Sequence, residues 1–413
     1  MSFTPHVDFD PLSESGLPHV TDVLSEARSR CPVFYSEKMQ AWAVTGYDDI
    51  RSIARDASRF SSVNAVSLGK TSIDPEVYSY LRAAGLPEHS SLVDIDDPEH
   101  SRRRKLVLRA FTARRVKAME AETKRMADTL IDAFIDAGQV EILSAYSFPL
   151  AVSVIMGILG VPDERMGDCL KWTSDIESLP AKARGGATVE EQLRLAESQV
   201  ALWEYAQALV AEREREGRDD LISDVIAASR ASDTPMTTKE MASLLPGLVM
   251  AGHRTTATLI GNTIYNLLVD QTRWQSLCEK PNGLPEAIEE VLRWDPPVLG
   301  VGRKATADVV VRGETIKDGD NVMLVWYSGN RDANIFECPE RFNADRPMET
   351  PHLTFGVGSH FCLGASLARM TSRVAIERVL ERIPNARLVS GTGMTLQPHA
   401  IFRARSEVRI AWM

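Results

Sequence analysis

A helical period dominates residues 98–295, where apolar side chains recur every three or four positions and charged side chains fill the places between them. Residues 237–269 form the longest apolar example, and Thr237 with Glu240 makes a capping box at its start. A further helix is predicted at about 363–383. The helices predicted before it cover residues 102–111, 117–137, 146–160, 190–215 and 237–269.

Shorter runs alternate between apolar and polar residues, which is the period of a strand. Residues 33–35 and 41–45 predict a small antiparallel sheet, and residues 297–346 contain further strand patterns. Together the two periods predict a mainly α fold with small β-sheets.

Two segments interrupt these patterns. Residues 61–95 are rich in Ser, Gly and Pro and predict loop with short helices. Residues 163–190 contain Pro180, Gly185 and Gly186, and this composition predicts a mobile segment.

Composition narrows the class of protein. The chain has 413 residues, 44% of them hydrophobic, and no Gly/Ser-rich or Pro-rich linker divides it, so we expect one domain over 1–413. The net charge of −10 argues against nucleic acid, because phosphate binding needs a basic surface. The longest apolar stretch, 151–161, is too short to span a bilayer, and 1–30 contain no apolar run of signal-peptide type.

The cysteines also indicate a compartment. They are odd in number and widely scattered, so they form no disulfide framework and suit a reducing cytoplasm. We therefore expect a soluble, cytoplasmic protein. The five are Cys31, Cys169, Cys278, Cys338 and Cys362.

Cys362 has the most informative surroundings. Residues 355–364 read Phe-Gly-Val-Gly-Ser-His-Phe-Cys-Leu-Gly and run into a helical pattern at Ala365. Glycines let this backbone turn tightly and approach a large planar group. The N–H groups that follow the sulfur, and the positive end of the helix, favour the thiolate over the thiol. Such a sulfur can push electron density onto a haem iron that must cleave an O–O bond.

Two other interpretations of Cys362 stay open. It could be a small buried hydrophobe, as many cysteines are. It could also bind zinc with His352, His360 or Cys338, although the paired spacing of structural zinc sites is missing.

The motif around Cys362 resembles the haem-ligand loop of the cytochrome P-450 family. Further motifs of the family occur in the right order: Ala-Gly-x-x-Thr at 251–255, Glu-x-x-Arg at 290–293, and a meander that includes Arg346. The resemblance runs from about residue 20 to the end. It implies a mainly helical, single-domain cytochrome P-450 fold with haem b between the long central helix and the cysteine-loop helix.

The resemblance also implies roles for individual residues. Cys362 would be the axial ligand of the haem iron, and Thr255 would aid proton delivery. The Glu290–Arg293 pair would hold the thiolate side of the haem mechanically. Charge-assisted donors would anchor the buried haem propionates, and these are His100, Arg104, Arg303 and His360.

Arg254 departs from the family pattern, which usually has a carboxylate before the threonine. A guanidinium stays protonated and cannot pass on a proton as a carboxylate does. Because neighbouring helix residues point about 100° apart, Arg254 need not face the iron with Thr255. It could form an outward ion pair, or it could reach the pocket and bind a substrate carboxylate. The small residues 251 and 252 would let oxygen and substrate approach the helix.

The implied reaction inserts one oxygen atom from O₂ into a hydrophobic small molecule, by hydroxylation, O-dealkylation or epoxidation. Electrons would come from NAD(P)H through ferredoxin reductase and ferredoxin, to a monomeric enzyme. Ferredoxin would dock by electrostatic steering on exposed arginines at 102, 103, 109, 114 and 115. The alternatives are a peroxide-driven hydroxylase or decarboxylase of an acidic substrate, and a non-catalytic haem protein that senses a ligand.

The resemblance places the pocket walls as well. They would come from residues 61–95, 163–190, 244–255, 297–301 and 398–402. The apolar side chains near the haem favour a hydrophobic substrate.

Overall fold

The computed structural model describes residues 7–66, 68, 73–87, 91–347 and 349–413. The chain forms two compact units that alternate along the sequence. Unit 1 comprises Met1–Gly69, Val116–Ala151 and Arg254–Met413, and unit 2 comprises Lys70–Arg115 and Val152–His253. The expectation of a single domain over the whole chain stays a prediction.

The main sheet of unit 1 has five strands in the order β1-β2-β8-β5-β3. The first two strands pair antiparallel, with Val33 opposite Val44, as predicted. The second strand then pairs parallel with a strand that lies far away in sequence. The strands are β1 (Val33–Ser36), β2 (Ala41–Val44), β3 (Phe60–Ser61), β5 (Val301–Ala305) and β8 (Asn321–Leu324).

Two smaller sheets also belong to unit 1. The hairpin β6 (Val309–Val311) and β7 (Glu314–Ile316) forms one of them. The other has the order β4-β10-β9, with β4 (Gln139–Glu141), β9 (Arg387–Leu388) and β10 (Arg409–Ala411). The mainly α class with small sheets is thereby confirmed.

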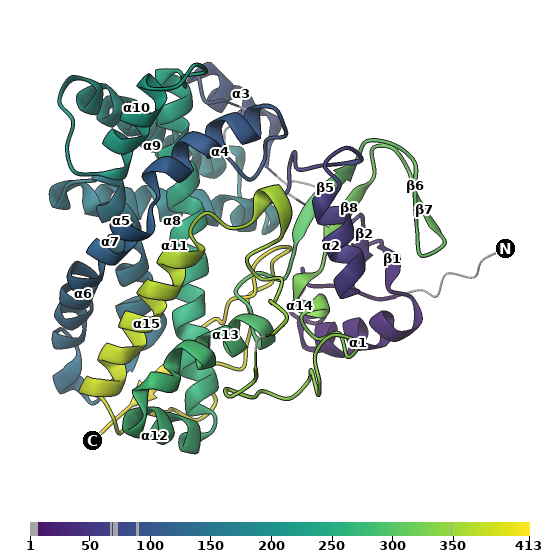
Figure 1. Cartoon of the computed structure of the whole chain (residues 1–413), viewed down its shortest axis with the longest axis vertical. Coiled ribbons are helices and arrows are strands. Elements are labelled where there is room, and N and C mark those ends of the chain that lie inside the picture. Colours follow the sequence, from purple (N-terminus) through teal and green to yellow (C-terminus); the bar gives the residue numbers. More distant parts are fainter. Residues whose placement is uncertain (1–6, 67, 69–72, 88–90, 348) are drawn as a thin grey trace. The chain divides into compact units, whose positions relative to one another are not determined.

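Helix α15 (Ala365–Arg382) is central to the helical part of unit 1 and confirms the helix predicted at 363–383. It lies along α6 (Glu120–Asp132) in Figure 1, and Arg373 and Arg378 of α15 form ion pairs with carboxylates of α6. The other helices that lie within the unit are α1 (Val20–Arg30), α2 (Tyr47–Arg55), α12 (Gln271–Glu279), α13 (Leu284–Trp294) and α14 (Trp326–Gly329).

Unit 2 is built from helices. They are α3 (Pro75–Ala83), α4 (Glu99–Ala110), α8 (Met166–Arg184), α9 (Val189–Arg215) and α10 (Leu221–Arg230). Helix α8 is a continuous helix of 19 residues within 163–190, and the mobility of this segment stays a prediction. Pro180 lies near its C-terminal end, and Cys169, Thr173 and Leu179 are buried along one side. Side-chain burial therefore outweighs the turn-forming residues.

Three helices continue across the boundaries between the units. They are α5 (Ala113–Ala118), α7 (Phe148–Leu159) and α11 (Thr238–Leu268). The start of α11 is capped as predicted: Glu240 N–H donates to Thr237 Oγ1 at 3.2 Å, and Thr237 N–H donates to Glu240 Oε2 at 2.7 Å. The two bonds satisfy N–H groups that a helix start leaves without partners.

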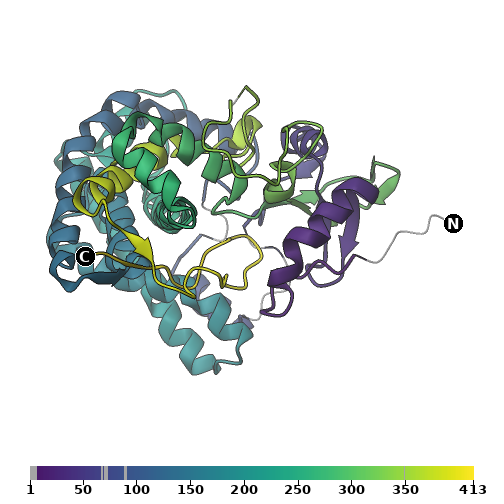
Figure 2. The same ribbon diagram turned by 90° about the horizontal axis from the view of Figure 1, so that it is seen from below.

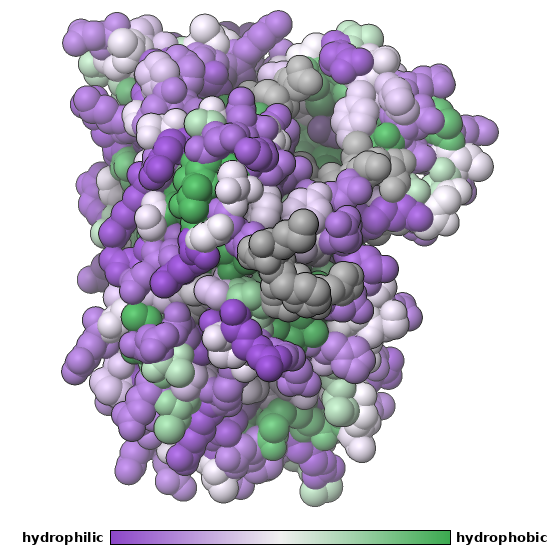
Figure 3. Space-filling model, turned by 90° about the vertical axis from the view of Figure 1, so that its right-hand side faces the viewer, coloured by the Kyte–Doolittle hydropathy of each residue, from purple (hydrophilic) through white to green (hydrophobic). Residues whose placement is uncertain are grey.

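None of the helices in the described part of the chain is both long and apolar enough to cross a bilayer. Figure 3 draws one face of the molecule, on which hydrophilic residues predominate and hydrophobic residues occur in small groups.

Candidate active site

The loop before α15 holds Cys362 in a defined conformation. Cys362 N–H donates to the carbonyl oxygen of Phe355 at 2.7 Å, which closes the loop on itself. Gly356 and Gly358 have φ values of 72° and 75°, a region that disfavours residues with a Cβ atom. Cys362 is partly buried and lies three residues before the first residue of α15. The predicted arrangement of sulfur, glycine turns and helix N-terminus is therefore present.

The loop has the shape and chemistry that a thiolate-ligated haem needs. A Cβ atom added at Gly364 would meet nothing within 4 Å, so the backbone is open there, and Phe361 is 44% exposed. Arg303 and His360 of the same unit supply nitrogen donors suited to carboxylates. These residues fit a haem.

A zinc site finds no support. Among the residues that the structure describes, no group of three or more His, Cys, Asp or Glu side chains could hold a metal ion. His352 contacts Glu289, and Cys338 is exposed.

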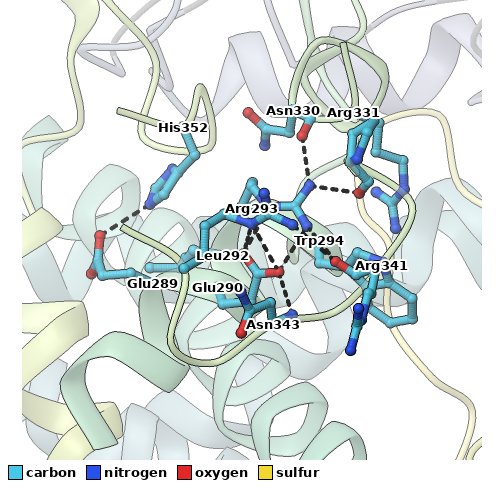
Figure 4. A network of polar contacts seen from close by, with 12 residues as sticks. Glu289, Glu290, Leu292, Arg293, Trp294, Asn330, Arg331, Arg341, Asn343 and His352 are labelled. Atoms are coloured by element: carbon cyan, nitrogen blue, oxygen red, sulfur yellow. Dashed lines mark hydrogen bonds and ion pairs between the residues drawn. The ribbon is translucent and has the colours of Figure 1, made fainter. Parts of the chain in front are cut away.

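Arg293 and Glu290 form a fully buried ion pair on α13. Arg293 Nε lies 2.7 Å from Glu290 Oε2, and both side chains are 0% exposed. Arg293 Nη1 also donates to the carbonyl oxygens of Asn330 and Pro339, both at 2.9 Å (Figure 4). Arg346 adds a third side chain, with its Nε 3.2 Å from Glu290 Oε2. The Arg293 guanidinium is therefore held between Glu290 and the carbonyl oxygens at 330 and 339, and its predicted role on the thiolate side of the haem stays a prediction.

Asn330 connects this cluster to the cysteine loop. Its Oδ1 accepts from Leu353 N–H at 2.6 Å, and its Nδ2 donates to Thr354 Oγ1 at 2.9 Å. Thr354 directly precedes Phe355, so a continuous chain of hydrogen bonds runs from Arg293 to the start of the loop. Sequence reasoning did not find this link, because the separation between 293, 330 and 354 gives no periodic signal.

A second cluster that sequence reasoning missed lies beside Phe355. Arg369 pairs with Glu289 at 2.6 Å, and its guanidinium lies 4.5 Å from the centroid of the Phe355 ring. His352 Nε2 is 3.2 Å from Glu289 Oε2 (Figure 4). Burial alone would raise the pKa of Glu289, but hydrogen bonds with Arg369 and His352 outweigh it and lower the pKa to about 2. The acid is therefore ionised at any working pH.

Two of the four predicted propionate donors lie in unit 1. Arg303, on β5, is 6% exposed, and its Nη1 donates to the carbonyl oxygen of Gly302 at 2.7 Å. His360 lies in the cysteine loop, with its Nε2 3.1 Å from Ser62 Oγ. Ser62 follows β3, which pairs with β5. The same edge of the sheet therefore carries Arg303 and supplies a hydroxyl to His360.

The other two donors, His100 and Arg104, lie in unit 2 on α4, four residues apart and so on one face of the helix. His100 is 1% exposed, with its Nδ1 3.7 Å from Asp97 Oδ1, and Arg104 is half-buried. The structure thus places two donors in each unit, and the convergence of all four stays a prediction.

The residues before Thr255 make contacts of their own. His253 is buried; its Nδ1 donates to the carbonyl oxygen of Val249 at 2.6 Å, and its Nε2 lies 3.0 Å from Glu177 Oε1. A Cβ atom at Gly252 would lie 3.0 Å from Ile155. Close packing against Ile155 within unit 2 therefore favours glycine at position 252. The sequence suggests another role for its small size, which is to let oxygen and substrate approach the helix. Thr255 itself is half-buried.

Arg254 contacts the C-terminal segment, and both interpretations drawn from the sequence stay predictions. Its Nη2 donates to Gln397 Oε1 at 3.1 Å, and its guanidinium carbon lies 4.9 Å from the centroid of the Phe402 ring. Both contacts are with uncharged groups of the C-terminal segment.

The predicted basic patch needs correction. Arg102 and Arg103 form ion pairs with Glu240 of α11. These two arginines are therefore partly neutralised within unit 2.

Arg115 is also paired with carboxylates, so its charge does not add to the predicted basic patch. It lies 2.9 Å from Asp219 and 2.6 Å from Asp224. Burial would lower the pKa of Arg115, but the two aspartates outweigh it and raise the pKa. Arg109 and Arg114 are exposed.

Comparison with known proteins gives a consistent result. The sequence model of the family described as cytochrome P-450 matches residues 283–383, from the start of α13 to the end of α15. Cytochrome P-450 107B1 of Saccharopolyspora erythraea is 34% identical over 359 residues, which cover 85% of this chain and 84% of the relative. Mycinamicin IV hydroxylase/epoxidase of Micromonospora griseorubida is 33% identical over 394 residues, which cover 94% of this chain and 93% of the relative.

A solved structure agrees along the same length. Cytochrome P-450 CREJ in complex with (4-ethylphenyl) dihydrogen phosphate matches with a TM-score of 0.89 at 31% identity, over 99% of this chain and 100% of that chain. Identity above 30% over most of both chains shows common descent and a common fold. The protein is therefore a member of the cytochrome P-450 superfamily, a haem oxidoreductase that incorporates oxygen from O₂ into a small-molecule substrate.

Proposed function

We propose that this protein is a haem-thiolate monooxygenase of a hydrophobic small molecule, with Cys362 as the axial ligand of the iron. The observation that carries the proposal is the cysteine loop: a partly buried sulfur just before a helix N-terminus, on a backbone with two left-handed glycines. When bound, the haem supplies the oxygen-activating chemistry, and thiolate ligation suits it to cleave the O–O bond.

The chain's own residues position and desolvate this group. The Glu290–Arg293 cluster and Asn330 hold the start of the cysteine loop, so the sulfur keeps its place. His100, Arg104, Arg303 and His360 would hold the propionates, since buried carboxylates need charge-assisted donors. None of these side chains needs to move during turnover.

Thr255 is proposed to hold a water molecule with its hydroxyl and to pass a proton through it. A threonine hydroxyl can donate and accept at once, as a relay requires. Arg254 cannot replace the usual carboxylate in this relay, because a guanidinium does not release its proton at working pH.

The near-haem wall supports a hydrophobic substrate. Val298, Leu299 and Ile401 are 9%, 3% and 2% exposed, and backbone hydrogen bonds bring their two segments together. The relative from Micromonospora griseorubida is named for the hydroxylation and epoxidation of mycinamicin IV. We extend these reaction types, with O-dealkylation, to this chain.

Electrons are proposed to come from NAD(P)H through ferredoxin reductase and ferredoxin, in the cytoplasm, to a monomeric enzyme. Exposed Arg109 and Arg114 remain available to an acidic donor, and Leu108 beside them is 46% exposed. Such a surface combines electrostatic steering with a small apolar contact.

The test is turnover of the haem-loaded protein with a surrogate ferredoxin and its reductase, NAD(P)H and isotopically labelled O₂. The proposal expects one labelled oxygen atom in each product molecule. Product formed only with added peroxide would favour the peroxide-driven alternative. Ligand binding without any product would favour the sensor.

A further inference from the structure

The C-terminal segment forms a hairpin whose turn consists of residues 398–402, and Figure 2 shows this segment in yellow folding back on itself. Gln397 N–H donates to the carbonyl oxygen of Ala404, and Leu396 forms a bridge with Arg405, so the two arms are paired. Residues 395–397 and 404–406 form the two arms, with the turn 398–402 and Arg403 between them.

The turn and Arg403 are bound to residues 297–299. Leu299 N–H donates to the carbonyl oxygen of Ile401 at 2.7 Å, and Arg403 N–H donates to that of Pro297 at 2.9 Å. Val298 and Phe402 form a β-bridge. These contacts join Ile401, Val298 and Leu299 into the apolar wall described above.

His399 organises the turn from inside. Its Nδ1 accepts from the N–H groups of Ile401 and Phe402, at 3.0 and 3.2 Å. Its ring lies 4.8 Å from that of Phe402, measured between centroids. The turn thus has a defined conformation. These contacts are local, and the second arm meets α11 through Arg405, whose guanidinium carbon lies 3.6 Å from the centroid of the Tyr265 ring.

Arg254 supplies a connection to α11. Its Nη2 donates to Gln397 Oε1 on the first arm, and its guanidinium carbon lies 4.9 Å from the centroid of the Phe402 ring at the end of the turn. Arg254 also directly precedes Thr255, within the same compact unit as the hairpin. One side chain therefore contacts the first arm and the turn from the residue next to the proposed proton-delivering threonine.

We propose that Arg254 is a specificity-determining positioning residue, which fixes the turn 398–402 and its apolar wall relative to Thr255. The inference rests on the proposed function in one respect, which is that this apolar wall faces the substrate. It accounts for an arginine at this position, because one guanidinium donates an N–H to Gln397 and also lies over the ring of Phe402. Lysine has a compact ammonium in its place.

Hydrogen exchange of the haem-loaded, ligand-free protein tests the connection without turnover. Arg254→Met should speed exchange of the amides of Ile401, Phe402 and Arg403 by about three- to tenfold, as expected for the loss of one cation–π contact with its hydrogen bond. Phe402→Leu should give the same change, and the double variant no more than the larger single effect. Arg254→Lys should fall between wild type and Arg254→Met.

Arg273→Met is the matched control. Arg273 lies over the ring of Phe342, 4.6 Å from its centroid, in the same unit, and it also contacts Asp270 and the carbonyl oxygen of Asn266. This variant should leave exchange at 401–403 unchanged. If Arg254→Met fails to fold, Gln397→Ala with Phe402→Leu measures the same contacts from the other side.

Substrate readouts complete the test. For any substrate found by spectral shift, Arg254→Met should broaden the distribution of oxidised positions, and Arg254→Lys should partly restore it. Unchanged exchange in Arg254→Met would overturn the proposal. If amide exchange stays unchanged and Arg254→Met selectively loses affinity for acidic ligands, Arg254 contacts the substrate directly and the proposal is wrong. A failure of the proposed function would appear separately, as wild-type protein without a thiolate-type spectrum.

Discussion

Arg293 shows how one side chain can stabilise several segments of the chain. Its fully buried guanidinium is paired with Glu290 and donates to carbonyl oxygens at 330, 339 and 341. Removing Glu290 leaves a buried guanidinium without its carboxylate, and removing Arg293 leaves the buried Glu290 with Arg346 as its remaining ion-pair partner. Either change costs far more than the pair contributes over an apolar replacement.

We therefore predict that Arg293→Met lowers the free energy of unfolding by about 3–5 kcal/mol and weakens haem retention. Glu290→Gln should have an effect of similar size. The control is Arg30→Met on α1, whose pair with Glu26 is 72% and 65% exposed and should contribute less than about 1 kcal/mol. Urea denaturation of all three variants measures the difference. Equal midpoints for Arg293→Met and Arg30→Met would contradict this account.

Glu289 gives a prediction about pH. Its pKa falls from 4.5 to about 2 in the folded protein, because contacts with Arg369 and His352 outweigh the effect of burial. An acid with a lowered pKa stabilises the fold above its ordinary pKa, and this contribution is lost as the pH falls towards the folded value. The stability difference between wild type and Glu289→Gln should therefore be full above about pH 5 and shrink towards pH 2. Denaturant titrations across this range measure it, and a difference that grows on acidification would refute the assignment.

At the scale of elements, local signals located most helices. The capping box placed the start of α11, and the glycine-cysteine motif placed the start of α15. The sequence prediction missed helix α8, because it gave Pro180 and the two glycines more weight than the positions that the helix buries. The parallel pairing of β2 with β8 joins residues about 280 positions apart, and no local pattern reports such a contact.

The same limit applies to the site. Cys362, Thr255 and the Glu290–Arg293 pair lie in motifs whose spacing is visible in the sequence. The partners of the site residues, such as Asn330 for Arg293 and Ser62 for His360, are chosen by packing between distant segments. Asn330 and His352 lie near motifs that the sequence shows, but their spacing does not report which side chains they contact.

Helix α4 gives a prediction about the electron donor. Arg109→Glu should raise the apparent KM for ferredoxin several-fold at low salt, with a smaller effect at high salt and unchanged substrate binding. Arg115→Glu is not a suitable variant, because it would place a carboxylate against Asp219 and Asp224. Arg387→Glu, an exposed residue on β9, serves as the charge-reversal control. If ferredoxin-dependent turnover responds equally to both variants, the donor does not use α4.

At the scale of the whole molecule, the chain combines a family-wide fold with local departures from the family pattern. The match with mycinamicin IV hydroxylase/epoxidase covers 94% of the chain. The cysteine loop lies within residues 283–383, which the sequence model of the family matches. Arg254 departs from the usual carboxylate, and its contacts with the C-terminal hairpin give it a role in shaping the pocket.

The central claim, that Cys362 ligates the haem iron as a thiolate, is tested most directly by the absorption spectrum of the reduced, CO-bound protein. Wild type and Cys338→Ser, the exposed-cysteine control, should both show the red-shifted Soret band of a thiolate-ligated haem. Cys362→Ser should lose that band and most of its haem. A wild-type spectrum of the histidine-ligated type, or a thiolate band that survives in Cys362→Ser, would contradict the account.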